Sequence, residues 1–163
     1  MTTKKYEKNI QLKENLKEQG FPEDVSKVPE DFSCCVKTSG VWACWGKPKH
    51  NTLSNSDWIC LQVGESTDIG TEMRMDRQYS MGKFYNHKGI YKNHAGHEIF
   101  DYDRPLSKRQ RVWKHIGENY TGLIFVIIGL SEDQEERLQM EERYALEKEA
   151  VYWNRSPKQR RAN

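Results

Sequence analysis

Three polar residues in this sequence are of types that could take part in phosphodiester hydrolysis. Arg74 follows an apolar run that turns on a glycine, Glu142 lies in a long segment of mixed apolar and charged residues, and Asn154 follows that segment. Metal-dependent hydrolysis needs a cation that stabilises charge on the phosphate and a carboxylate that holds a divalent ion. We therefore predict that Arg74 contacts a phosphate and that Glu142 binds a metal.

Glu142 is singled out by its predicted place on a helix. At about 100° per residue, Leu138, Ala145 and Leu146 share one helix face, and Glu142 projects from the middle of that face. A carboxylate in an apolar stripe is costly unless a cation pairs with it. The alternative is a glutamate at the margin of the stripe that bends toward water. Glu149, on the same predicted face, is the second candidate for the metal ligand.

The elements that position these groups are predicted from apolar periodicity. Strands are expected at 39–47 and 57–64, which form an antiparallel hairpin with a long loop, and at 121–130, whose continuous apolar run is typical of a buried strand. Helices are expected at 5–19, at about 66–79, at 105–120 and at 131–152. Ser66 or Asp68 is expected to cap the second helix and Ser131 the last one.

The fold class that follows is α/β, a small, central, mostly antiparallel sheet of about three strands flanked by helices. The N-terminal helix and a loop and helix region between the strands are additions to this sheet. We expect one domain over 1–163, with a helix and connection at 1–38, the core at 39–154 and a basic tail at 155–163.

Charge distribution favours a nucleic-acid partner. The formal net charge is only +2, but basic residues cluster at 107–115 and 154–161, and acidic residues cluster at 131–143. No apolar run is long enough to cross a bilayer, and the N-terminus lacks the apolar centre of a secretory signal, so we expect a cytoplasmic protein with no membrane partner. The four cysteines include no Cys-x-x-Cys pair, which disfavours a zinc knuckle.

The arrangement resembles that of the GIY-YIG nucleases. Their core has a hairpin with Gly-Ile-Tyr on its first strand and Tyr-Ile-Gly on its second, then a helix with a catalytic arginine, a third strand, and a helix with a metal-binding glutamate followed by an asparagine. Here "GVW" at 40–42 resembles the first element and "QVG" at 62–64, continued by "ES", the second. The resemblance covers about 39–154 and is greatest to compact restriction endonucleases. It implies the same roles for Arg74, Glu142 and Asn154.

Both signature tyrosines are replaced in this sequence. Trp42 and Gln62 stand in their places, and Arg74 is displaced by about two residues from the family's spacing. Neither an indole nor an amide can lose a proton near neutral pH. Tyr79 and His87 are the candidate substitutes for the general base, and Lys83 is a third.

Further residues are expected to contact substrate. Gly64 and Ser66 belong to the turn after the second strand. The basic helix can grip phosphates, or it can be an ordinary solvated face. Its expected contacts are Lys108, Arg109, Arg111 and Lys114. His94 and His97, with His87 and Asp101 or Asp103 nearby, can form a metal cluster, or the same stretch can be a loop that reads a DNA groove.

These observations lead to two hypotheses. The first is a metal-dependent DNA endonuclease of the restriction or phage type that uses Mg²⁺, or Mn²⁺ in its place, and that can act on a palindromic target as a homodimer. The second is a non-catalytic nucleic-acid- or protein-binding module on the same core, such as a phage-encoded inhibitor of the anti-CRISPR kind or a repressor. The missing tyrosines motivate the second hypothesis.

Overall fold

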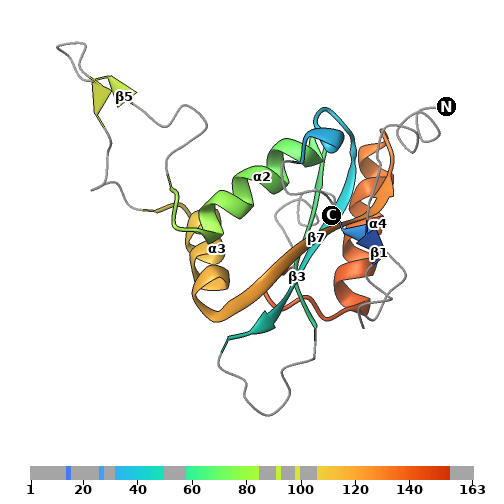
Figure 1. Cartoon of the computed structure of the whole chain (residues 1–163). Coiled ribbons are helices and arrows are strands. Elements are labelled where there is room, and N and C mark those ends of the chain that lie inside the picture. Colours follow the sequence, from blue (N-terminus) through green and yellow to red (C-terminus); the bar gives the residue numbers. More distant parts are fainter. Residues whose placement is uncertain are drawn as a thin grey trace. The chain divides into compact units, whose positions relative to one another are not determined.

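A computed structural model of the chain describes residues 14–15, 26–27, 32–49, 58–84, 91–92, 98–99 and 106–154. Within these ranges the protein has the predicted α/β class, with three long antiparallel strands and three α-helices (Figure 1). The chain divides into two compact units. The first unit joins residues 1–74 to 119–163 and holds the sheet, and the second unit comprises residues 75–118.

The sheet is built around the predicted hairpin. β3 (Gly40–Pro48) pairs antiparallel with β4 (Ile59–Ser66) and, on its other side, with β7 (Tyr120–Leu130). The predictions of the hairpin and of the third strand are confirmed. Two short strands, β1 (Glu14–Asn15) and β2 (Ser26–Lys27), extend the sheet beyond β7, which gives the order β1-β2-β7-β3-β4.

The N-terminal helix predicted over 5–19 is wrong at β1, where Glu14 and Asn15 pair with Lys27 and Ser26. The rest of that range lies outside the described residues. Apolar residues repeated among charges suit an amphipathic helix, but pairing with β2 decides the backbone at these two positions.

Three α-helices follow the predicted pattern with changed ends. They are α2 (Ile69–Ser80), α3 (Lys108–Asn119) and α4 (Gln134–Glu147). The smaller elements are the 3₁₀ helix η2 (Ser33–Cys35) and the hairpin of β5 (Tyr91–Lys92) with β6 (Glu98–Ile99).

The last helix is shorter than predicted at both ends. Asp133, not Ser131, is its N-cap, because the Asp133 carboxylate accepts the N–H of Glu135 at 3.1 Å, while the Ser131 hydroxyl accepts the N–H of Asp133. At the other end Glu149 has a φ of 52°, in the left-handed region that terminates helices. Glu149 is therefore off the helix and exposed, and it does not share a helix face with Glu142.

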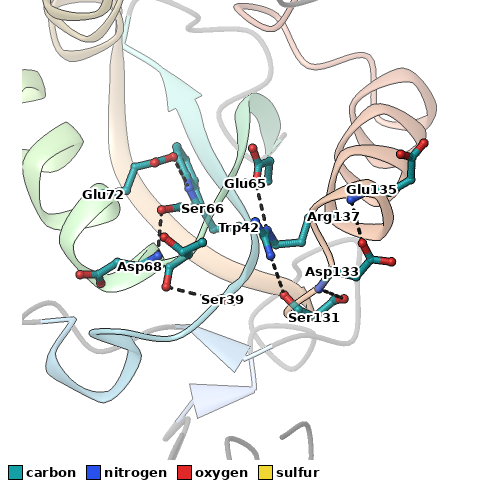
Figure 2. A network of polar contacts seen from close by, with 11 residues as sticks. Ser39, Trp42, Glu65, Ser66, Asp68, Glu72, Ser131, Asp133, Glu135 and Arg137 are labelled. Carbon is teal, nitrogen blue, oxygen red and sulfur yellow. Dashed lines mark hydrogen bonds and ion pairs between the residues drawn. The ribbon is translucent and has the colours of Figure 1, made fainter. Parts of the chain in front are cut away.

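The two faces of the sheet carry different cores. Val41, Ala43 and Trp45 alternate along β3 toward α4, where they pack with Tyr144 and Ala145. Trp42 points to the opposite face, toward Phe125 and the first turn of α2. Figure 2 shows α2 and α4 meeting the strands from opposite sides.

The start of α2 is fixed by Asp68, one of the two caps predicted. Its carboxylate accepts the N–H of Thr71 at 3.1 Å, the Thr71 hydroxyl at 2.8 Å and the N–H of Lys37 at 2.8 Å. Burial raises the pKa of Asp68, but these hydrogen bonds and the Lys37 charge outweigh burial, so the pKa lies below its ordinary value of 3.8. Ser66 supports the cap by accepting the N–H of Asp68 at 2.9 Å.

We expect Asp68→Ala to lower the free energy of unfolding by about 0.5–2 kcal/mol at pH 7, which is the usual cost of losing an N-cap. A carboxyl whose folded pKa is depressed stabilises the fold above its unfolded pKa, and this contribution is lost as pH falls through the folded pKa. The difference in unfolding free energy between the variant and the wild type should therefore become smaller below pH 3.8. Urea denaturation at several pH values measures this difference. Thr67→Ala, at an exposed neighbour, is the control, and a gap that stays constant with pH would contradict the assignment.

Candidate functional site

Trp42, which the resemblance aligns with the first signature tyrosine, is buried in the fold. Only 2% of its surface is exposed, and its Nε1 donates to Oε1 of Glu72 at 2.9 Å (Figure 2). The indole lies directly over Gly64, its partner on β4, where a Cβ would come within 2.5 Å of the ring. A glycine is therefore required at position 64 for close packing of Trp42. This packing explains the glycine without a contact to substrate.

Glu72 lies two residues before Arg74 in the sequence. Its carboxylate, in the first turn of α2, is the acceptor for the Trp42 indole. The residue that the resemblance aligns with the first tyrosine is thus an indole bonded to a carboxylate. A pair of this kind offers neither a proton-accepting phenolate nor a cation for a phosphate.

Gln62 and Arg74 have more access to solvent than Trp42. Gln62, in the second tyrosine's place, is half-buried, and its Oε1 accepts the N–H of Val63 at 3.1 Å. Arg74 is exposed on α2. Ser66 is half-buried, and its hydroxyl serves the turn before α2.

The inward face of α4 differs from the predicted face. Its buried residues are Arg137, Glu141, Tyr144 and Ala145. Leu146, predicted to face the core, is 53% exposed, and Glu142 is half-buried at the margin of the face. Glu141 is the carboxylate that turns inward, with an exposed fraction of 4%, and its Oε1 accepts the Trp153 indole N–H at 3.0 Å.

A buried ion pair joins α4 to β4 and was not predicted. Nε of Arg137 donates to Oε2 of Glu65 at 2.9 Å, and Nη1 of Arg137 donates to the carbonyl of Ser131 at 3.2 Å (Figure 2). The side chains of Arg137 and Glu65 are 4% and 5% exposed. The sequence does hold one sign of a charged inward face. Arg137 and Glu141 are four residues apart, and residues at that separation share one face of a helix.

The chain after α4 returns to the edge of β4. The N–H of Val151 donates to the carbonyl of Cys60 at 3.1 Å, and the N–H of Tyr152 donates to the carbonyl of Leu61 at 2.8 Å. This places the stretch that leads to Asn154 beside the strand that carries Gln62. Asn154 itself is exposed. Since α2 and α4 lie on opposite faces of the sheet, the structure does not bring Arg74 and Glu142 together on one face.

Of the three candidate general bases, Tyr79 is buried. Tyr79 is only 6% exposed, with its ring stacked on Phe84 at 6.4 Å and the Arg109 guanidinium 5.7 Å from its centre. Lys83 is exposed, and His87 lies outside the described residues. Sequence analysis did not consider Tyr152, but burial and the neighbouring Tyr120 raise its pKa to about 12, so it stays protonated at neutral pH.

The second unit carries the predicted basic helix. Lys108, Arg111 and Lys114 on α3 are exposed, as a phosphate-binding face requires. Arg109 is 43% exposed, and its Nε contacts the buried carboxylate of Asp76 at 2.7 Å, which fixes its orientation within the unit.

The alternative histidine cluster is not placed, because His94, His97, Asp101 and Asp103 lie outside the described residues. In the described part of the chain, no three histidine, cysteine or acidic side chains group as metal ligands, and no helix is long and apolar enough to cross a membrane. No family model matches the sequence, and no curated protein or solved structure shows significant similarity to this chain.

Proposed function

We propose that this protein binds DNA through a GIY-YIG-like core and does not cleave it by the family's tyrosine-based chemistry. The observation that carries the proposal is the buried Trp42 indole, which stands where the resemblance implies a tyrosine and is bonded to Glu72. The order of hairpin, helix, third strand and final helix supports the choice of core.

DNA is favoured as the partner by the exposed cations. Lys108, Arg111 and Lys114 follow one another on α3 with the spacing of about one helical turn, and Arg74 is exposed on α2. Lysine and arginine side chains that neutralise phosphates release counterions, so the affinity of such a protein falls as salt rises. A repressor that binds DNA would show the same salt dependence, so DNA binding is measured first.

The decisive experiment incubates plasmid and single-stranded DNA with the protein in Mg²⁺ and in Mn²⁺ over a range of pH, and measures binding and cleavage on the same samples. Salt-dependent binding without cleavage supports the proposal. Cleavage that survives re-purification and is lost in Glu142→Ala would replace it with the hydrolytic function. Absence of binding to either DNA at low salt would overturn both.

We expect Arg111→Ala to weaken DNA binding and to reduce the slope of log affinity against log salt by about 1, the effect of losing one phosphate contact. The Arg111 Nη1 donates to the carbonyl of Leu106, so the stability of each variant is measured alongside binding. Fluorescence anisotropy at several salt concentrations gives the slope. Arg143→Ala, an exposed arginine on α4, is the matched control. If both variants have equal slopes of log affinity against log salt, Arg111 on α3 does not contact the DNA.

A metal-dependent endonuclease is the second candidate, and it is favoured by the edge of β4. The hydrogen bonds from Val151 and Tyr152 bring the stretch before Asn154 to the strand of Gln62, and α4 carries the half-buried Glu142. One carboxylate suits Mg²⁺, which keeps several waters and substrate oxygens as its other ligands. Bound there, the ion would offset charge on the phosphate and leaving oxygen.

In this second candidate Arg74 would contact the attacked phosphate, and His87 or Lys83 would supply the base. Glu142→Ala and Arg74→Ala should each abolish cleavage, whereas Glu136→Ala, at an exposed glutamate of the same helix, should not. A palindromic target calls for two active sites, so sedimentation with and without DNA tests the proposed homodimer.

A further inference from the structure

Two adjacent cysteines before the first long strand hold their thiols together. Cys34 and Cys35 both lie in η2 and are both in the thiol form. Their Sγ atoms are 3.3 Å apart. Cys34 is half-buried and reachable from solvent, whereas Cys35 is fully buried. The pair therefore consists of one accessible thiol with a second thiol directly behind it.

The turn that carries the pair is held in place from several directions. Phe32 and Lys37, on either side, have φ values of 58° and 59°, in the left-handed region. The Phe32 carbonyl accepts the N–H of Cys35 at 3.1 Å, and the Phe32 ring packs edge-on against Phe125 at 5.3 Å. The N–H of Lys37 is bonded to Asp68. A backbone fixed at both ends keeps the two sulfur atoms close.

Packing against α2 adds to this restraint. A Cβ on Gly70 would come within 2.5 Å of the carbonyl carbon of Cys35, so the turn lies directly on the first turn of the helix. The N–H of Ile69 also donates to the carbonyl of Thr38 at 2.9 Å. Packing on α2 therefore holds the turn in place, and closing the bridge must strain the backbone between the two cysteines.

We infer that Cys34 and Cys35 form a reversible dithiol–disulfide site that reacts with low-molecular-weight disulfides. A disulfide bond is about 2.05 Å long, so the sulfur atoms must approach by about 1.2 Å. Adjacent Cα atoms are about 3.8 Å apart, below the usual separation of about 4.4–6.8 Å for bridged cysteines. The bridge is therefore strained and easily reduced, as labile disulfides are.

The reaction proceeds by two thiol–disulfide exchanges. The Cys34 thiolate attacks one sulfur of oxidised glutathione, which forms a mixed disulfide at Cys34 and releases one glutathione thiolate. The Cys35 thiolate then attacks Sγ of Cys34, which forms the Cys34–Cys35 bond and releases the second thiolate. The two thiol protons pass to solvent and the leaving thiolates. The protein dithiol is oxidised by two electrons, and one glutathione disulfide is reduced to two thiols.

The test is treatment of the full native chain with oxidised glutathione, followed by acid quenching, alkylation, intact mass and peptide mapping. The wild type should lose two hydrogens and give a Cys34–Cys35 bridged peptide, and dithiothreitol should restore the original mass. Cys35→Ser should retain one glutathionyl group at Cys34. Cys34→Ser should stay unmodified, because Cys35 is not accessible.

Two controls keep the result interpretable. The double variant Cys34→Ser/Cys35→Ser retains the buried Cys44 and Cys60 and should keep its mass, which excludes those thiols. Phenylarsine oxide, which bridges two thiols, should be retained by the wild type but not by either single variant. A wild-type protein that stays as a stable glutathionyl adduct, or that stays unmodified, overturns the inference. The thiol exchange does not depend on DNA binding, so these outcomes do not test the proposed function.

Discussion

An Arg137→Ala variant is expected to lose about 3–5 kcal/mol of unfolding free energy, the usual effect of removing one partner from a buried ion pair. The Arg137 guanidinium contacts the Glu65 carboxylate at 2.9 Å, and both side chains are almost fully buried. Removing the guanidinium leaves a desolvated carboxylate on β4 without this cation. Urea denaturation followed by tryptophan fluorescence measures the loss.

A matched exposed pair provides the control. Lys114 and Glu118 on α3 also lie 2.9 Å apart, but their side chains are 48% and 58% exposed. Lys114→Ala should therefore cost no more than about 0.5 kcal/mol. The double variant Arg137→Met/Glu65→Leu should recover most of the lost stability, because apolar replacement of both partners removes the desolvation cost. If Arg137→Ala costs no more than Lys114→Ala, the pair does not hold α4 on the sheet.

The same ion pair explains where sequence analysis of α4 failed. Apolar periodicity assigns charged residues to the solvent side, so Leu146 was expected inside, whereas the structure exposes Leu146 and buries Arg137. A charge can be buried when a partner neutralises it, but the partner, Glu65, lies 72 residues away in the chain. Periodicity within one helix carries no information about such a partner.

The three long strands could be predicted because their burial does not depend on a distant partner. The apolar runs of β3, β4 and β7 need no distant partner to identify them, because their own composition indicates burial. The two-residue strands β1 and β2 have no such run, and their pairing with the sheet is decided by tertiary contacts. Helix ends also depend on single caps, which is why α4 begins at Gln134 rather than after Ser131.

The sequence suggests candidate site residues but not their contacts. The resemblance aligns Trp42 and Gln62 with the family's two tyrosines. The partner of Trp42 is Glu72, 30 residues along the chain, and nothing local links the two. The hairpin register is the part that could have been foreseen, because it sets Gly64 opposite Trp42 and so leaves room for the indole.

The second large effect is expected at Trp42. Trp42→Ala should lower the free energy of unfolding by about 3–5 kcal/mol, because a side chain that is 2% exposed leaves a cavity between β3, β4 and Phe125. Trp42→Phe should cost less, since it keeps most of the ring and loses the hydrogen bond to Glu72. Trp58→Phe, at a half-buried tryptophan of the same hairpin, is the comparison.

DNA binding by Trp42→Phe separates a structural tryptophan from one that stacks on a base. Stacking on a base contributes about 1–3 kcal/mol, so loss of such a contact would weaken binding by roughly fivefold to more than a hundredfold. A buried indole bonded to Glu72 cannot reach a base, so the folded Phe variant should bind DNA with unchanged affinity and an unchanged salt slope. A fivefold or greater loss of affinity in a variant that remains folded would mean that Trp42 leaves its place over Gly64 when DNA binds. The closed Trp42–Glu72 pair would then be a resting arrangement, and it would no longer speak against hydrolytic chemistry at this position.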